Sequence, residues 1–330
     1  MAYKVLIIGC GAIAGGYDAE RSPDDWPLSH AGAIARSDDF ELVACVDPDE
    51  AAREAFAERW NVPVSVPDLE SLGANQGDYD LIVIASPTRF HGEHLEWAGQ
   101  MHTKAVFCEK PVATDALQAF RLHHGFDEGK MPLIVNYTRR WQPTLEPLIN
   151  DIRNDEWGDL INAVGTYAKG ILHNGSHMLD LLDMFVGQMT LQTVGPHWFD
   201  HWLDDPTVSA ILTANDMEQP VHLVPGNARS FTQFELVLTY DLGEIAIRDG
   251  GARIETRRVE DSDVFPGYRT LGPVMTQPGR YEEAMTLAYD NLAQVVARKG
   301  YPKFNSGNTA LSLCDKIRKL ALETPMKGPE

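Results

Sequence analysis

Cysteine is scarce in this chain, with four residues in 330. Cys10, Cys45 and Cys108 lie inside or just after stretches rich in Val, Ile, Leu and Phe, and Cys314 lies far from all three. Isolated cysteines in apolar stretches are typical of buried free thiols rather than of disulfides or zinc sites. We therefore expect a protein of a reducing compartment, the cytoplasm.

Positive charge is also scarce, because 28 Lys and Arg stand against 48 Asp and Glu, for a net charge of −20. A dispersed acidic excess repels phosphate backbones and anionic lipids, which makes nucleic acids and membranes poor partners. No apolar run approaches the roughly 20 residues of a membrane span, and no signal-peptide pattern precedes the first predicted strand. The composition predicts a soluble protein that binds any anionic ligand at a local site.

Short apolar runs alternate with helical patterns up to about residue 135, a rhythm typical of βαβ units in a parallel sheet. Strands are expected at residues 5–8, 42–46, 81–85, 105–108 and 133–135. Helices are expected at residues 50–60, 90–100 and 115–128. Thr114 is the predicted N-cap of the last helix. Residues 1–135 are therefore predicted to form a doubly wound α/β domain that binds a dinucleotide.

Residues 136–330 are predicted to form a second domain, since a chain of 330 residues exceeds the size at which one core stops growing. Period-two apolar runs at 231–239 and 244–248 follow each other closely and are bounded by Asp-Leu-Gly and Asp-Gly-Gly turns. Such runs indicate antiparallel strands. We expect an α+β domain with a mainly antiparallel open sheet.

Helical patterns also occur in this second part. Apolar residues from His177 to Phe185 follow helical spacing, and Gly187 stands where a helix would end. Further helices are expected within residues 281–322, where they can pack back toward the first domain.

A G-x-G-x-x-A motif at residues 9–14 follows the first predicted strand and precedes a predicted helix. In this context a dinucleotide-binding turn is favoured over a glycine-rich turn without a ligand. Gly9 would permit the tight turn, and Gly11 would let the backbone approach a pyrophosphate. Ala12 and Ile13 would offer amides of the helix N-terminus to the phosphates.

Asp47 ends the second predicted strand, where its carboxylate can bind both ribose hydroxyls of an adenosine and would repel a 2′-phosphate. NAD is therefore the predicted cofactor, and NADP is less favoured. Asp47 lies farther from Gly11 than the roughly 20 residues usual in this fold. This distance fits an insertion at residues 15–29, after which Ser29 resumes the helix. The insertion is interpreted as either a surface loop or a lid.

Ser86 and Thr88 follow the strand at 81–85, at the sheet edge where ligands collect, and could bond the ribose or phosphate of the cofactor. His91 either begins the next helix or contacts the cofactor.

Lys110 lies in the tripeptide Glu109-Lys110-Pro111, directly after the strand at 105–108. A lysine held there beside a nicotinamide could exchange a proton with a substrate hydroxyl. Glu109 would anchor the lysine or the cofactor, and Pro111 would stiffen the backbone. The alternative is a solvated Glu–Lys ion pair, against which the strand-end position argues.

His173, His177 and Asp180 fall four and three residues apart, so in a helix they share one face. A histidine here could take a hydroxyl proton or orient the substrate. Two core histidines, with Asp180 fixing a tautomer, are an alternative. A zinc site is another, although no thiolate cluster or His-Glu-x-x-His pattern accompanies the three residues. We therefore predict no metal.

Together these motifs resemble those of the Gfo/Idh/MocA family, the relatives of glucose-fructose oxidoreductase and inositol dehydrogenase, over nearly the whole chain. The family carries an acidic residue after the second strand, here Asp47. Its Thr-Pro-x-x-x-His stretch corresponds to residues 86–91, and its Glu-Lys-Pro motif contains a catalytic lysine, here Lys110. The resemblance implies an N-terminal Rossmann domain and NAD(P)-dependent oxidation of a sugar.

Residues 136–143 are similar to a family stretch that links the domains near substrate and nicotinamide. The resemblance implies substrate contacts for Arg139, Arg140 and Trp141, with the arginines placed to meet a charged group.

Residues 173–180 resemble the family's Asp-x-Gly-x-His-x-x-Asp motif, which implies a catalytic role for His177 and substrate contacts for Lys110, Asn174 and His177. His173 stands where the family has an aspartate. The exchange removes a negative charge and would better tolerate an anionic substrate. We expect His173 to take part in catalysis, although Lys110 could then carry more of the proton transfer alone.

The activity implied is reversible oxidation of a secondary sugar hydroxyl by hydride transfer to NAD. The Leu-His-Asn-Gly-Ser-His sequence and the Gly-Tyr-Asp insertion resemble relatives associated with surface-polysaccharide biosynthesis, so the sugar could be nucleotide- or phosphate-linked. The alternatives are a redox-neutral glycosidase or epimerase that retains NAD, and a non-catalytic regulator that senses sugar or NAD. Relatives assemble through the exposed face of the second-domain sheet, which implies a homodimer or homotetramer.

Overall fold

The computed structural model of the protein describes residues 2–214, 219–300, 302 and 308–323. The chain divides into two compact units. The first unit holds Met1–Trp141 and Glu282–Asn308, and the second holds Gln142–Tyr281 and Thr309–Glu330. Each unit is therefore built from two separate stretches of chain.

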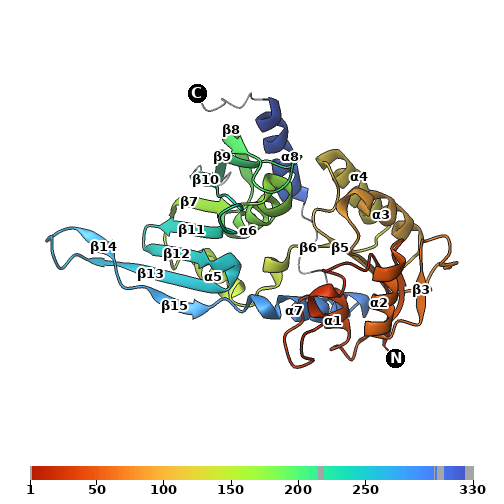
Figure 1. Ribbon diagram of the computed structural model, residues 1–330. Coiled ribbons are helices and arrows are strands. Elements are labelled where there is room, and N and C mark those ends of the chain that lie inside the picture. Colours follow the sequence, from red (N-terminus) through yellow and green to blue (C-terminus); the bar gives the residue numbers. More distant parts are fainter. Residues whose placement is uncertain (1, 215–218, 301, 303–307, 324–330) are drawn as a thin grey trace. The chain divides into compact units, whose positions relative to one another are not determined.

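A six-stranded parallel sheet with the order β3-β2-β1-β4-β5-β6 forms the centre of the first unit. Its strands β3, β5 and β6 are labelled in Figure 1. Its strands are β1 (Tyr3–Ile8), β2 (Phe40–Val46), β3 (Val64–Val66), β4 (Leu81–Ile84), β5 (Ala105–Glu109) and β6 (Leu133–Asn136). The strand order reverses at β1, which confirms the predicted doubly wound α/β class. The prediction missed β3, because three largely exposed residues give no apolar run.

The predicted helices of this unit form as α2 (Glu50–Trp60), α3 (His91–Gln100) and α4 (Ala116–Glu128). The predicted N-cap of α4 was wrong. The side chain of Asp115, in an extended conformation, accepts the hydrogen bond from Gln118 N. Asp115 lies three residues before that amide, the spacing a cap needs, whereas Thr114 lies one residue too early.

The helix after the glycine motif is interrupted, as the insertion at residues 15–29 predicts. After a single turn the chain leaves the helix, and it re-enters at α1 (His30–Ile34). His30 N donates to Ile13 O over 3.1 Å, and Ala31 N donates to Ala14 O over 2.8 Å. The hydrogen bonds of one helix thus run across the insertion, and the helix resumes with Ser29 as its N-cap, as predicted.

Asp18 closes the insertion at its base. Its buried carboxylate accepts hydrogen bonds from Leu28 N, Ser29 N and Ser29 Oγ. A Cβ at Gly32 would lie 2.1 Å from Asp18 Oδ2, so glycine is required where the loop meets α1. The base of the insertion is therefore fixed, and it sets the position of His30.

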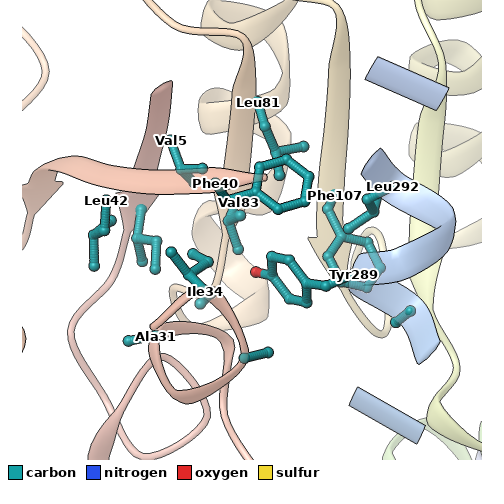
Figure 2. Close-up of a cluster of buried hydrophobic side chains, with 14 of the residues drawn as sticks. Val5, Ala31, Ile34, Phe40, Leu42, Leu81, Val83, Phe107, Tyr289 and Leu292 are labelled. Carbon is teal, nitrogen blue, oxygen red and sulfur yellow. The ribbon is translucent and has the colours of Figure 1, made fainter. Parts of the chain in front are cut away.

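Aromatic side chains from three elements meet in the core of the first unit (Figure 2). Tyr289 lies on α7 (Ala284–Val296) and packs edge-on against Phe107 and Phe40, with ring centroids 5.9 and 5.6 Å apart. Burying each such ring contributes about 1.5–3 kcal/mol. A segment near the end of the sequence thus completes the core of the N-terminal sheet.

The four cysteines are free and buried, as predicted. Burial raises the pKa of the Cys108 and Cys314 thiols well above its ordinary value, so these thiols stay protonated and unreactive.

The second unit contains a nine-stranded sheet with the order β14-β13-β12-β11-β7-β10-β9-β8, in which β15 also pairs with β13. Its strands are β7 (Leu160–Tyr167), β8 (Met189–Trp198), β9 (Thr207–Ala214), β10 (Pro220–Pro225), β11 (Phe234–Tyr240), β12 (Gly243–Arg248), β13 (Arg253–Asp261), β14 (Arg269–Leu271) and β15 (Met275–Pro278). The β7–β10 pair is parallel and the other pairs are antiparallel. The predicted mainly antiparallel sheet is confirmed.

Three helices accompany this sheet: α5 (Leu145–Arg153), α6 (Ser176–Val186) and α8 (Asn308–Glu323). As predicted, α6 ends at Gly187, whose φ is +72°. Its apolar face packs on β7, where a Cβ at Gly165 would lie 2.6 Å from Met178 Sδ. Within the described ranges, no helix combines the length and apolarity needed to cross a membrane.

Candidate active site

The glycine turn at the end of β1 has the shape of an anion cradle. Gly9 has a φ of +98°, and a Cβ there would lie 2.6 Å from Ser86 N, so the close approach of β1 and β4 requires glycine. Among the described residues other than Gly11 and its two chain neighbours, no atom lies within 4 Å of the place that a Cβ at Gly11 would take. Ala12 and Ile13 stand in the first turn, whose leading amides have no acceptor within the turn. A pyrophosphate fits this open, amide-lined turn.

A cavity of about 890 Å³ lies beside the turn, at the carboxyl ends of β1, β2 and β4. This is the edge at which open α/β sheets bind ligands. Three predicted cofactor residues line it, namely Gly9, Asp47 and Ser86. Its charged lining is largely acidic: Asp47, Asp68, Glu70, Glu93 and Glu96 face one cation, Arg89.

Backbone amides hold the Asp47 carboxylate at the end of β2. Oδ2 accepts a hydrogen bond from Cys10 N over 2.8 Å, and Oδ1 accepts one from Asp49 N over 2.9 Å. Arg53 donates to the Asp47 carbonyl over 2.8 Å. Each carboxylate oxygen has a second lone pair, so the Asp47 carboxylate can also accept hydrogen bonds from ribose hydroxyls.

His91 ties together two loops of the site. Its Nδ1 lies 2.8 Å from Pro111 O, and its Nε2 lies 2.8 Å from Ser86 O. Burial lowers the pKa of the imidazole. His91 thus begins α3 and joins the loop after β4, which contains Thr88, to the loop after β5. With both nitrogens engaged by the backbone, it is suited to holding the loops rather than to contacting a cofactor.

Glu109 and His30 form a buried pair at the end of β5. His30 Nε2 lies 3.0 Å from Glu109 Oε1, and Asn136 Nδ2 donates to the same oxygen over 2.7 Å. Since a carboxylate can only accept, Nε2 carries a proton, and Nδ1 lies 3.1 Å from the Tyr289 hydroxyl. Burial opposes ionisation of Glu109, yet the hydrogen bond and charge of His30, the Asn136 amide and the Lys110 charge keep its pKa below the ordinary value.

Lys110 is the next residue in the chain after Glu109, and it is half-buried. Glu109 points into the network under the strand end, so its side chain anchors the lysine segment rather than a ligand. In the 3-10 turn Thr138–Trp141, which follows β6, Arg139 is buried and Arg140 half-buried. Trp141 is a core residue, packed edge-on against Phe107 with centroids 6.4 Å apart. A substrate contact for these three residues stays a prediction.

The second unit contains another carboxylate–histidine pair. His173 lies on a π-helical turn (Gly170–Gly175) before α6, and its Nδ1 is 2.7 Å from Asp205 Oδ2. The His173 side chain is 35% exposed, and that of Asp205 is 2% exposed. The imidazole stacks on Trp202 with centroids 4.5 Å apart and planes at 19°. We call Asp205–His173 the half-exposed pair.

Asp205 also holds the backbone of the π-helical turn. Its carboxylate accepts hydrogen bonds from Leu172 N and His173 N over 3.0 Å each. A Cβ at Gly170, whose φ is +84°, would lie 2.1 Å from Asp205 Oδ2, so glycine is required at that position. The prediction from sequence missed Asp205 and Trp202, because nothing local links them to a motif some 32 residues earlier.

The remaining predicted residues of this motif lie where the helical pattern places them. His177 and Asp180 are on the first turns of α6, Asp180 being buried. Asn174 is half-buried on the π-helical turn. Among the residues that the structure describes, no group of three or more His, Cys, Asp or Glu side chains is arranged to hold a metal ion.

Comparison with known proteins supports the nucleotide fold. A family model described as the Gfo/Idh/MocA "Oxidoreductase family, NAD-binding Rossmann fold" matches residues 3–137. Inositol 2-dehydrogenase of Rhizobium meliloti is 34% identical over 114 residues, 34% of this chain and 33% of that protein. D-glucoside 3-dehydrogenase of Escherichia coli is 25% identical over 215 residues, 59% of this chain and 57% of that protein. The match thus spans about a third to three fifths of the length of these relatives.

Solved structures share the whole fold. The WlbA dehydrogenase of Bordetella pertussis, in complex with NADH and UDP-GlcNAcA, superposes with a TM-score of 0.77 at 19% identity, covering 98% of this chain and 96% of that one. KijD10, a 3-ketoreductase of Actinomadura kijaniata in complex with NADP and TDP-benzene, gives a TM-score of 0.76 at 17% identity, covering 97% and 98%. At these identities the likeness shows the fold of both units.

Proposed function

We propose that this chain, whose residues 3–137 match the Gfo/Idh/MocA oxidoreductase family model, belongs to that family and reversibly oxidises a secondary hydroxyl of a sugar or sugar derivative. The observation that carries the proposal is that the glycine turn after β1 and Lys110 after β5 follow the carboxyl ends of strands in one parallel sheet. Gly9, Asp47 and Ser86 line the cavity at the strand ends, and Lys110 follows β5 of the same sheet. The relatives named above act on inositol and on glucosides.

The cofactor we propose is NAD rather than NADP. When bound, it would accept or return a hydride at the nicotinamide. Five acidic side chains and one arginine line the cavity beside the glycine turn. A 2′-phosphate would add two negative charges close to Asp47, and an uncompensated like charge at a ligand site disfavours binding. The 2′-hydroxyl of NAD can instead donate to that carboxylate.

Lys110, His177 and His173 are the residues we propose to handle the hydroxyl proton. Glu109 is held by its hydrogen bond with His30, and this bond fixes the backbone next to Lys110. Positioned proton transfer of this kind contributes about 10²–10⁴-fold to a rate. Arg139, Arg140 and Asn174 would bind polar groups of the sugar, which could be nucleotide-linked, as UDP-GlcNAcA is in the WlbA complex.

We further propose that the protein is a cytoplasmic homodimer or homotetramer, with a role in surface-polysaccharide biosynthesis. Apolar side chains on one face of the second-unit sheet support the assembly. Ile211 is 37% and Val224 41% exposed on neighbouring strands β9 and β10, and a second copy of that face would cover them. Mass photometry at nanomolar concentration tests this: a monomer peak alone would contradict it.

The test of the function uses purified protein, NAD and a panel of myo-inositol, methyl glucosides and UDP-linked sugars. Wild type should gain thermal stability with NADH, gain less with NADPH, and form NADH with at least one panel member. Lys110→Ala should reduce turnover more than 100-fold while keeping the stabilisation by NADH.

The matched control is Lys104→Ala, at the other end of the same strand, where the lysine forms a surface ion pair with Asp80. This variant should retain wild-type turnover. Absence of any stabilisation by nicotinamide cofactors in the wild type would refute the proposal.

A further inference from the structure

We propose that Asp205 is a positioning residue of the substrate site: it fixes His173 so that the imidazole can exchange a proton with the substrate hydroxyl. The inference rests on the proposed oxidation. It assigns a role to a residue outside every motif of the sequence. The family motif has a carboxylate at position 173 itself. Here Asp205 supplies a carboxylate instead, and the His173 imidazole lies between it and the substrate.

The orientation of Asp205 does not depend on the histidine. The carboxylate is 2% exposed and accepts hydrogen bonds from Leu172 N and His173 N in addition to the imidazole. Gly170 leaves just enough room for it. Ile171 N donates to Pro206 O over 2.8 Å, which joins the same two segments again. The Asp205 carboxylate is therefore a fixed hydrogen-bond acceptor, and it orients the His173 imidazole.

Two contacts fix the imidazole in tautomer and in plane. An ionised carboxylate only accepts, so the 2.7 Å bond places the ring proton on Nδ1. The neutral ring then has its lone pair on Nε2, the form that a general base needs. Stacking on Trp202 sets the ring plane. With 35% of the side chain exposed, the ring is not sealed in the core.

The chemical step balances without any further reactant. In the oxidation direction the substrate C–H bond breaks and hydride leaves with its electron pair to the nicotinamide, while the O–H bond breaks and C=O forms. The sugar is oxidised and the cofactor reduced. The hydroxyl proton passes to Nε2 of His173, and the Asp205 carboxylate stabilises the imidazolium. In the reduction direction Nε2 returns the proton to the forming hydroxyl.

The first arm of the test is spectroscopic and needs no substrate. Long-range ¹H–¹⁵N spectra of histidine-labelled protein should show His173 protonated on Nδ1, identified as the signal lost in His173→Gln. Asp205→Asn presents an amide that can donate to Nδ1, so the tautomer should change to Nε2–H. A wild-type ring already protonated on Nε2, or a tautomer unchanged by Asp205→Asn, would overturn the proposal.

The second arm is kinetic and uses the panel sugar with the fastest turnover. Asp205→Asn and His173→Gln should each lower kcat about 100-fold or more, with KM within about threefold of wild type. The control is His201→Gln, a neighbouring exposed histidine that contacts Trp202 edge-on, and it should keep wild-type kcat. Wild-type kcat in His173→Gln would overturn the proposal.

Folding and function are kept separate in this design. If Asp205→Asn does not fold, His173→Gln carries the kinetic arm, because it leaves the bonds from the backbone to Asp205 in place. A wild type without turnover on the whole panel would contradict the proposed oxidation, while the tautomer measurement still decides the role of Asp205.

Discussion

Each unit of this protein contains a buried carboxylate bonded to a histidine, and the two pairs differ in what surrounds the imidazole. In the buried pair, Glu109–His30, the ring is fully enclosed and Tyr289 occupies its second nitrogen. In the half-exposed pair, Asp205–His173, the ring is a third exposed and lies against Trp202. The same two functional groups are thus suited to different tasks: an enclosed imidazole can only hold structure, whereas an exposed one can also exchange protons.

Breaking the buried pair should have the largest effect on stability. His30→Ala leaves the Glu109 carboxylate buried beside Asn136 without its main partner, and an uncompensated buried charge costs about 3–5 kcal/mol. Urea unfolding followed by fluorescence measures the loss. His173→Ala is the comparison: the Asp205 carboxylate keeps its hydrogen bonds from Leu172 N and His173 N, and its ion pair with a partly exposed histidine is worth about 1 kcal/mol or less. Equal losses in the two variants would remove the distinction between the pairs.

Acid should destabilise the buried pair in a definite pH range. The pKa of Glu109 is lowered in the folded protein, so its contribution is complete above the unfolded pKa of about 4.3 and is lost as pH falls through the folded value. The free energy of unfolding should therefore decrease below about pH 4.3. Glu109→Gln cannot ionise, and it should flatten this part of the profile. An unchanged acid slope in that variant would show that other carboxylates account for it.

Removing the Tyr289 hydroxyl should give the smallest loss of stability. Tyr289→Phe keeps the ring in the aromatic core and removes the hydroxyl that is hydrogen-bonded to His30 Nδ1, which should cost about 0.5–1.5 kcal/mol. Thermal unfolding measures it, with Tyr3→Phe, a partly exposed ring packed on Phe40, as the control. A loss no greater than that of the control would show that the hydroxyl does not support the pair.

The architecture followed from periodicity, because repeating apolar spacing is a local property of the chain. The parallel and antiparallel sheets could be predicted in this way, and the insertion followed from the long spacing between Gly11 and Asp47. The end of α6 at Gly187 likewise needed only a local signal, a glycine after the last apolar residue. The cap of α4 was missed by one residue, since Thr114 and Asp115 are both good caps and backbone conformation decides between them.

The partners of the site histidines could not be predicted. Glu109 lies 79 positions from His30, and Asp205 lies 32 positions from His173. No spacing rule connects such residues, because strand order and loop path bring them together only in the folded chain. Motifs therefore pointed to Lys110, His173 and His177 as candidates, while the pairing of Glu109 with His30 and of Asp205 with His173 emerged from the structure.

The difference between the pairs is tested most directly by the single-turnover rate of NADH formation in His173→Gln, at saturating NAD and sugar. We predict a rate about 100-fold below wild type in a protein whose unfolding midpoint is unchanged within about 2 °C, because the half-exposed pair acts in proton transfer and contributes little to stability. A wild-type rate of hydride transfer in this variant would contradict the account.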